Sequence, residues 1–427
     1  MPQPTLDGLI GVLRMVTHDG SAHLRDHRTC AVSATSVEEH AAAVEALLAA
    51  LATRPAQRIP LAEALGRVCF EDVRSPVDLP LFRNSQMDGY AVDSRSVSTT
   101  PVTLPVSTVI AAGPAASAVL ASGSAAKIMT GAPIPEGADA IVPVEDTTVT
   151  ADGSVTIERG RAPGEFVREQ GSDVRIGTVL VEAGRVLEPR HISVLAAVGY
   201  AEVDVRSRPR VAVVTTGAEL VDAGSTLTPG QIYDSNGITL ASHLRASGAE
   251  VVMVARSSDD PSRFRQVLDE ATQSAELIIT SGGVSMGDFE VVKDVLRPLG
   301  GTFGSVRMQP GGPQGMTMFD GVPVLSFPGN PVSTVVSYIM FARNIVRRAA
   351  GLPPISSGTA LLHDAIVSPP GRRQLLRGRL RDDGRVELVA GPGSHLVAAL
   401  AWADVLIDID SETTELAAGS NVEVWPL

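Results

Sequence analysis

The segment TSGGVSMG at residues 280–287 has the composition of a loop that binds an anion. It follows the apolar run 277–279 and precedes a helical pattern over residues 290–299, so we expect it to join a buried strand to a helix. Glycines let a backbone approach a phosphate closely, and the start of a helix supplies unpaired N–H donors and a partial positive charge. The loop therefore predicts a phosphorylated small molecule as ligand. A tight strand-to-helix turn can also need its glycines for packing alone.

Acidic residues follow the other strands expected in this part of the chain. Glu219 ends the segment TTGAE, Asp259 and Asp260 precede Pro261, and Glu290 follows the glycine loop. The carboxyl ends of parallel strands meet at one edge of a sheet, so these side chains should converge there. Carboxylates beside a phosphate site are typical of bound Mg²⁺. Asp259 and Asp260 also suit the N-cap of a helix that begins with proline, and this alternative stays open.

These segments belong to a regular alternation of strand and helix patterns between residues 210 and 351. The strand patterns cover 211–215, 251–254, 277–280 and 322–325, and the helical patterns cover 236–246, 261–271, 290–299 and 332–350. Such alternation predicts an α/β domain with a central, doubly wound parallel sheet.

The rest of the chain has other residue patterns, and together they indicate a multidomain α/β protein. Short β-like runs separated by Gly, Pro, Ser and Thr fill one long stretch, and helical patterns flank it on both sides. Strand alternation returns after the break GLPP at 351–354. We expect a disordered N-terminal extension at 1–34, followed by a helical linker domain at 35–74 plus 172–208. An inserted β-rich domain at 75–171 would interrupt the linker domain. The central α/β domain would cover 209–350 and a small C-terminal β-barrel 351–427.

The overall composition excludes several classes of protein. A formal net charge of −13 argues against a general binder of nucleic acid or of anionic membranes. No apolar run reaches the roughly 20 residues that a membrane span requires. Two cysteines imply no disulfide framework, which fits a reducing cytoplasm. We therefore expect a cytoplasmic protein without nucleic-acid or membrane partners.

Five longer motifs occur in an order typical of one family. They are NSQMDGYA at 84–91, MTGAPIPEGADA at 129–140, GQIYDSN at 230–236, SGGVSMG at 281–287 and PGNPVS at 328–333. Asp-Gly alone signals only a hairpin, and the turns rich in Gly and Pro show no chemistry unaided. Taken together, from about residue 36 to the C-terminus, the chain resembles the MoeA-type molybdopterin molybdenumtransferases, which are gephyrin E-domain-like.

The resemblance implies an elongated homodimer of multidomain chains. The central domain would be similar to the MogA-type adenylyltransferase and bind the pterin nucleotide, and the inserted β-rich domain of the partner subunit would help to form the cleft. The implied reaction is the Mg²⁺-dependent insertion of molybdate into adenylylated molybdopterin with release of AMP. A contact with a MogA-type adenylyltransferase is also implied.

The matching motif positions imply three groups of functional residues. The catalytic polar set would be Asp88, Thr130, Asp173 and Glu219. The substrate-binding set would be Ser281, Gly282, Gly283, Ser285, Pro328, Gly329, Asn330, Pro331, Arg377 and Ser394, of which Arg377 and Ser394 match residues linked to oxyanion binding. Asp259 and Glu290 would hold Mg²⁺ or its water shell, with Asp88 and Glu219 closer to the inserted metal.

The chain departs from the family pattern where lysines are usual. Ser305, Gln309 and Gly312 occupy the positions of three lysines that would face molybdate or phosphate. Strand alternation would place Arg307 on the same face as Ser305 and Gln309, from which it could reach the same anion. Glu290 also replaces the usual Asp.

These departures leave a second interpretation beside the active enzyme. In it the chain is a catalytically weak paralogue that carries molybdopterin or serves as a scaffold. An adenylyltransferase acting one step earlier fits less well, because the chain keeps both flanking β-domains.

Overall fold

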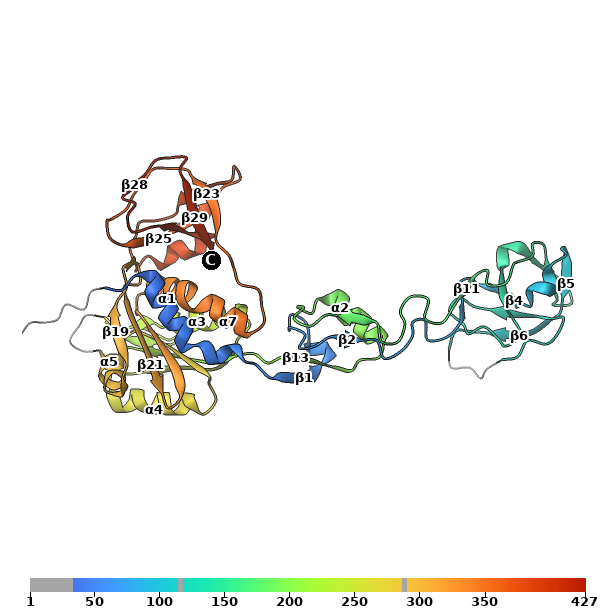
Figure 1. Cartoon of the computed structure of the whole chain (residues 1–427), viewed down its shortest axis with the longest axis horizontal. Helices are drawn as coiled ribbons and strands as arrows, with labels where there is room; N and C mark the ends of the chain where they lie inside the picture. The colour runs from blue at the N-terminus through green and yellow to red at the C-terminus, as the bar shows by residue number, and fades with distance from the viewer. Residues whose placement is uncertain (1–33, 114–117, 286–289) are drawn as a thin grey trace, which may run out of the picture.

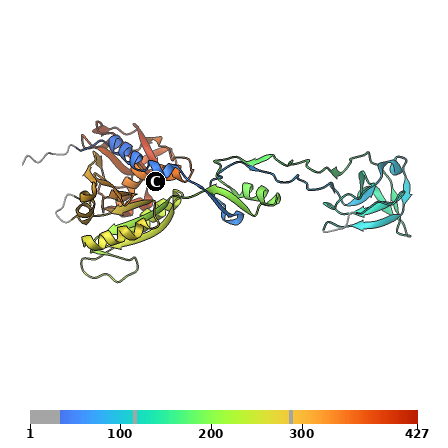
Figure 2. The same ribbon diagram turned by 60° about the horizontal axis from the view of Figure 1, so that its bottom comes forward.

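The computed structural model describes residues 34–113, 118–285 and 290–427. The chain is elongated and forms several packed units arranged in a row (Figure 1, Figure 2). An α/β unit and a C-terminal β unit lie together at one end, a small unit lies in the middle, and the inserted β-rich unit lies at the other end. The extension expected at 1–34 lies outside the described residues except for Ala34.

The α/β unit is built on a six-stranded sheet with the order β17-β14-β18-β22-β21-β19. Its parallel strands are β14 (Arg210–Thr216), β17 (Glu250–Ser257), β18 (Leu277–Ser281) and β22 (Val322–Phe327). The expected doubly wound parallel core is therefore present. β21 (Pro313–Phe319) and β19 (Thr302–Ser305) extend it in antiparallel orientation. Gly, Pro and polar residues in these two strands obscure their alternation in the sequence.

Helices cover both faces of this sheet. One face carries α3 (Ser235–Ala246) and a long helix. The long helix consists of α6 (Pro331–Ser337), the π-helical turn η6 (Tyr338–Ala342) and α7 (Arg343–Ala349). The other face carries α4 (Pro261–Thr272) and α5 (Val291–Leu296). Alternate residues of β14 explain this arrangement, because Val211 and Val213 pack with the first group and Ala212 and Val214 with the second.

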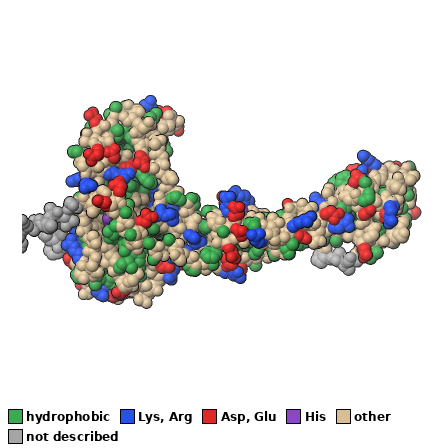
Figure 3. Space-filling model, in the orientation of Figure 1, with side chains coloured by type: hydrophobic (Ala, Val, Ile, Leu, Met, Phe, Trp, Pro, Cys, Tyr) green, Lys and Arg blue, Asp and Glu red, His purple; other side chains and the backbone are tan. Residues whose placement is uncertain are grey.

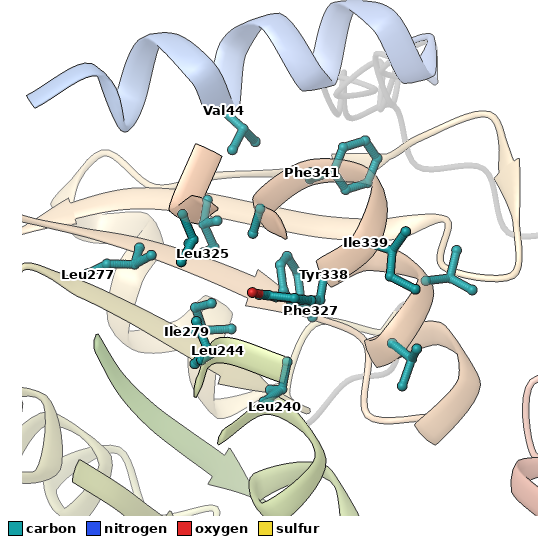
Figure 4. Packing of buried hydrophobic residues seen from close by; sticks show 14 of the residues in the cluster. Val44, Leu240, Leu244, Leu277, Ile279, Leu325, Phe327, Tyr338, Ile339 and Phe341 are labelled. Atoms are coloured by element: carbon teal, nitrogen blue, oxygen red, sulfur yellow. The ribbon is translucent and has the colours of Figure 1, made fainter. Parts of the chain in front are cut away.

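The first helix, α1 (Val37–Leu47), packs on the α/β unit. It begins with a capping box formed by Ser36 and Glu39. Its residue Val44 is fully buried in the same hydrophobic cluster as Phe341 (Figure 4). We expected residues 35–74 to form one linker domain with residues 172–208. The first helix instead packs into the core of the α/β unit, and only the later part of 35–74 packs with residues from 172–208.

His40 gives the packing of α1 a pH dependence. Its imidazole is buried against the Phe341 ring, with the ring centroids 4.6 Å apart, and desolvation lowers its pKa to about 4. The folded state therefore prefers neutral His40, whereas the unfolded chain takes up a proton once the pH falls below about 6.5. We expect acidification from about pH 7 to about pH 5 to reduce the free energy of unfolding by about 2 kcal/mol through His40.

Urea unfolding of the wild type and of His40→Leu at both pH values checks this expectation. Leucine cannot titrate. Acidification should therefore reduce the free energy of unfolding of the variant by about 2 kcal/mol less than that of the wild type. His243, whose pKa is also lowered by burial, is present in both proteins and cancels in the comparison. An equal pH dependence in the two proteins would contradict the assignment to His40.

The middle unit combines two short antiparallel ladders with one helix. β1 (Ala56–Pro60) pairs with β13 (Glu202–Arg206), and β2 (Val73–Arg74) pairs with β12 (Val179–Val181). α2 (Pro189–Ala197) packs on them through Leu195. Chain segments from both sides of the inserted unit thus form one core.

The inserted unit contains a four-stranded sheet, β6-β7-β4-β8, and a three-stranded sheet, β5-β10-β9. Its strands are β3 (Asn84–Ser85), β4 (Gly89–Val92), β5 (Val102–Leu104), β6 (Val106–Ile110), β7 (Ala125–Ile128), β8 (Ala140–Pro143), β9 (Thr147–Val149), β10 (Val155–Ile157) and β11 (Val167–Arg168). Every residue of β4 is buried, so this strand anchors the unit.

The C-terminal unit is a small closed barrel. Its strands follow the order β25-β26-β23-β29-β27, and a pairing between β25 and β27 closes it. The strands are β23 (Gly358–Leu362), β25 (Arg373–Leu380), β26 (Arg385–Leu388), β27 (Val405–Ile409) and β29 (Asn421–Pro426), beside the separate pair β24 (Ile366–Val367) and β28 (Glu415–Leu416). β20 (Met308–Gln309) of the α/β unit pairs in parallel with β25 and joins the two units.

Acidic and basic side chains are interspersed on the face shown in Figure 3, which carries no broad basic surface. Within the described part of the chain, no helix is both long and apolar enough to cross a membrane.

Candidate functional site

A cleft of about 850 Å³, hereafter the main cleft, opens at the carboxyl ends of β14, β18 and β22. It is lined by residues that follow these strands, by the start of α3 and by residues from 309–313. Residues 392–395 of the C-terminal barrel form a further wall. The main cleft therefore lies at the sheet edge predicted from the sequence and between two structural units.

The glycine loop forms part of this cleft. All four described residues predicted to bind ligand there line it: Ser281, Gly282, Gly283 and Ser285. Gly282 and Gly283 have φ angles of 103° and 66°, which favour glycine. A Cβ atom on Gly282 would lie 2.6 Å from Thr216 Oγ1, so the loop packs tightly against the end of β14.

Thr216 is a lining residue that the sequence did not single out. Its Oγ1 is buried and has no hydrogen-bond partner among the described residues. A buried hydroxyl without a partner costs roughly 1–3 kcal/mol, which a ligand oxygen would offset. The Thr216 hydroxyl therefore adds a polar group to the glycine loop on this side of the ligand space.

The second predicted loop lies beside the first. Pro328, Gly329, Asn330 and Pro331 all line the main cleft, and α6 begins at Pro331. Asn236 links the two loops, because its Nδ2 donates to Ser281 Oγ at 3.0 Å and to Gly329 O at 2.7 Å. Asn236 was part of the motif at 230–236, yet nothing in that motif distinguished it from its neighbours.

Four carboxylates line the main cleft: Glu219, Asp234, Asp259 and Glu290. The structure decides between the two interpretations of Asp259 and Asp260. Asp260 caps α4 by accepting the Arg263 N–H at 2.9 Å. Asp259 accepts the Ala218 N–H at 3.1 Å and lines the cleft, so it is the carboxylate available to a ligand.

The other two acidic positions near β14 are held by local structure. Asp234, which the sequence did not single out, caps α3 by accepting the Gly237 N–H at 3.0 Å and also accepts Thr215 Oγ1–H at 2.6 Å. The Glu219 carboxylate lies against Gly217, where a Cβ atom would come within 2.7 Å of both of its oxygens. Only glycine at position 217 leaves room for this carboxylate.

The charge of the main cleft suits an anionic ligand only if a cation accompanies it. Among the described lining residues there is no lysine or arginine. The described residues also contain no cluster of three or more Asp, Glu, His and Cys that could cage a metal. Mg²⁺ commonly uses one or two carboxylates together with phosphate oxygens, and Asp259 and Glu290 are two of the carboxylates that line this cleft.

Of the two residues predicted from the C-terminal unit, one lines the main cleft and the other is buried in the barrel. Ser394 lines the main cleft, and its carbonyl accepts the Val332 N–H at 3.2 Å. Arg377 is fully buried in β25 and donates to Gly391 O and Gly393 O. Burial lowers the pKa of Arg377, and the residue does not line the cleft. The structure therefore gives Arg377 the position of a support for the 391–394 loop.

Three predicted catalytic residues lie outside the main cleft. Asp88 and Thr130 are exposed in the inserted unit, at the opposite end of the chain (Figure 1). Thr130 N–H and Oγ1–H donate to Asp88 Oδ1 at 2.7 and 2.8 Å, and these bonds lower the pKa of Asp88. Asp173 is exposed between β11 and β12. A single chain thus does not bring these three residues to Glu219.

A second cleft of about 440 Å³, hereafter the side cleft, adjoins the main cleft. The three positions at which lysines were expected, Ser305, Gln309 and Gly312, all line it. Arg307, which was predicted to share a face with Ser305 and Gln309, lines the same cleft. Arg372, which the sequence did not single out, lines the same space. Residues 309–311 and Pro313 line both clefts and form a shared wall.

Three protein-family models match consecutive parts of this chain. The MoeA N-terminal region (domain I and II) matches residues 35–199, a probable molybdopterin binding domain matches residues 212–348, and the MoeA C-terminal region (domain IV) matches residues 359–427. The second of these matches contains both predicted loops of the main cleft.

Similar proteins match over nearly their whole lengths. A Mycobacterium tuberculosis (strain H37Rv) protein named molybdopterin molybdenumtransferase 2 is 44% identical over 406 residues, covering 92% of this chain and 99% of that protein. A Haemophilus influenzae protein named molybdopterin molybdenumtransferase is 35% identical, covering 86% and 92%. The crystal structure of the molybdopterin biosynthesis MoeA protein from Pyrococcus horikosii superposes with a TM-score of 0.76 at 30% identity, covering 92% and 99%. The motifs, the architecture and these matches agree, and the chain belongs to the MoeA family.

Proposed function

We propose that this chain is a molybdopterin molybdenumtransferase, which inserts molybdate into adenylylated molybdopterin and releases AMP. The observation that carries the proposal is the main cleft, in which a glycine loop adjoins Asp259 and Glu290. A phosphoanhydride with an associated Mg²⁺ complements both features. The names of the relatives support the same activity.

In this proposal the residues of the main cleft bind and orient the nucleotide. Residues 281–285 and the Thr216 hydroxyl contact phosphate oxygens, and residues 328–331 shape the pterin pocket. Asp259 and Glu290 would hold Mg²⁺, which when bound would neutralise phosphate charge and polarise the phosphoanhydride. The two dithiolene thiols replace one oxygen of molybdate, which leaves as water while the oxidation state of molybdenum is unchanged. Hydrolysis of the phosphoanhydride by water then gives AMP and molybdopterin phosphate, and this makes the insertion effectively irreversible.

We further infer that the working unit is a homodimer in the cytoplasm. The predicted residues Asp88 and Thr130 lie in the inserted unit, at the opposite end of the elongated molecule from the α/β unit that contains Glu219 (Figure 1). An antiparallel arrangement of two elongated chains would bring Asp88 and Thr130 of one copy to Glu219 of the other. A MogA-type adenylyltransferase would supply the adenylylated substrate to the same cleft.

Gly282→Ala is expected to weaken binding of adenylylated molybdopterin roughly 10-fold or more, because alanine is strained at a positive φ and its Cβ would displace Thr216. Equilibrium binding measured by calorimetry checks this. Gly304→Ala is the matched control, since a Cβ there meets nothing within 4 Å and its φ is not positive. Equal weakening in both variants would show that the loop geometry is not responsible.

AMP release by the purified protein, supplied with adenylylated molybdopterin and Mg²⁺, tests the proposed function. Molybdate should stimulate the release. The competing function, a weak paralogue that only carries molybdopterin, is favoured by the lack of lysine and arginine among the described residues of the main cleft. Tight binding of the substrate without molybdate-stimulated release would establish that alternative and refute the enzyme.

A further inference from the structure

The two adjoining clefts carry opposite charge. The described lining of the main cleft contains four carboxylates, whereas that of the side cleft contains Arg307 and Arg372 and no acidic residue. A free dianion is repelled by the first surface and attracted by the second. The side cleft is therefore the more favourable place for an oxyanion that must reach the main cleft.

Strand register places Arg307 and Arg372 side by side in the backbone, each directly before one of two paired strands. β20 pairs in parallel with β25, with Met308 opposite Arg373, and the Arg373 N–H donates to Arg307 O at 2.9 Å. Arg307 and Arg372 directly precede these two paired residues, and both side chains are exposed. Like charges on neighbouring strands repel each other, so an anion between them would stabilise this arrangement.

Neither arginine is neutralised by an ion pair in the described ranges. Arg307 Nη1 donates to Ala34 O at 3.1 Å, which leaves its remaining N–H groups for another acceptor. Hydrogen bonds with Ser36 are the main reason that the pKa of Glu39 is lowered, and Arg307 contributes less, so the Glu39 carboxylate is engaged chiefly in the capping box. The contrast with the adjacent Arg373 is clear, because Arg373 pairs with Asp408 at 2.6 Å.

We propose that Arg307 and Arg372 form a binding site for a tetrahedral oxyanion, molybdate, in the side cleft. This inference rests on the proposed function. Guanidinium groups donate parallel pairs of N–H groups that match oxyanions. Molybdate held there lies next to the shared wall of residues 309–311 and Pro313 and enters the main cleft along it. The two arginines thus supply charge in a cleft where Ser305, Gln309 and Gly312 supply none.

The double variant Arg307→Gln/Arg372→Gln tests the site by the molybdate dependence of AMP release. We expect the KM for molybdate to rise roughly 10-fold to 100-fold, as the loss of charged hydrogen bonds predicts. The rate at saturating molybdate and the KM for adenylylated molybdopterin should stay within about 2-fold of the wild type. Arg245→Gln is the control, because Arg245 is exposed on α3 and lines neither cleft. Arg372→Lys should retain part of the affinity.

Calorimetric titration of both proteins with molybdate alone separates the two proposals. Weaker molybdate binding by the double variant supports the site even if wild-type AMP release is absent, in which case only the proposed function fails. Equal affinity of the two proteins for molybdate would overturn the site. Where both proteins are active, their KM values for molybdate would then be equal as well. A reduced maximal rate with an unchanged molybdate KM would also overturn it, because it would place the arginines in the later chemistry or in folding.

Discussion

Asp259→Asn is expected to reduce molybdate-dependent AMP release roughly 100-fold or more, an effect comparable with the loss of one preorganised electrostatic contact in other enzymes. The substitution removes one of the two carboxylates proposed to hold Mg²⁺. The amide oxygen of asparagine can still accept the Ala218 N–H, so the loop after β14 should keep its geometry. The rate should be measured over a range of Mg²⁺ concentrations, and the remaining activity should require more Mg²⁺ than the wild type needs.

Asp260→Asn is the matched control for this prediction. The two residues are adjacent and undergo the same chemical change, but Asp260 caps α4 and does not line the main cleft. Asparagine is as good an N-cap as aspartate, so stability and activity should both stay near wild-type values. Similar rates for the two variants would contradict the role assigned to Asp259.

Two inactive variants are expected to restore activity when they are co-expressed and assemble into mixed dimers. Asp88→Asn removes a carboxylate from the inserted unit, and Glu219→Gln removes one from the main cleft. If each active site combines these units from two chains, a mixed dimer has one site with both changes and one site with neither. Isolated mixed dimers should therefore have about half of the wild-type activity, because one of the two sites in each dimer is intact.

The measurement uses two affinity tags to isolate mixed dimers and compares them with each homodimer. The pair Glu219→Gln and Asp259→Asn is the control, because both residues line the same cleft of one chain. Every site of that mixed dimer lacks one of the two carboxylates, so no activity should return. Restoration by the control pair, or none by the test pair, would refute a site shared between two chains.

The sequence predicted the main cleft well because its loops follow directly from buried strands. Ser281, Gly282, Gly283 and Ser285 belong to one such loop, and their placement needs only the topology of a parallel sheet. Asp259 and Asp260 could not be separated in this way, since either residue can cap a helix that starts with proline. Which of them accepts the Arg263 N–H depends on the backbone torsions at the end of β17.

Contacts between distant segments were beyond sequence reasoning. The apolar face of α1 suits any apolar surface, so its pattern did not reveal that Val44 would pack into the α/β unit. Arg377 was identified by its motif, but full burial and two backbone carbonyl acceptors are properties of the folded barrel. Arg372 was missed because only the pairing of β20 with β25 brings it near Arg307.

The number of molybdenum atoms inserted for each AMP released tests the central claim most directly. Purified protein should be given adenylylated molybdopterin, Mg²⁺ and molybdate, and both products should be measured in the same reaction, with the cofactor assayed by its ability to activate a molybdenum-free apoenzyme. Coupled insertion predicts one molybdenum inserted for each AMP, and neither product in quantity when molybdate is omitted. AMP release without active cofactor, or substrate binding without either product, would contradict it.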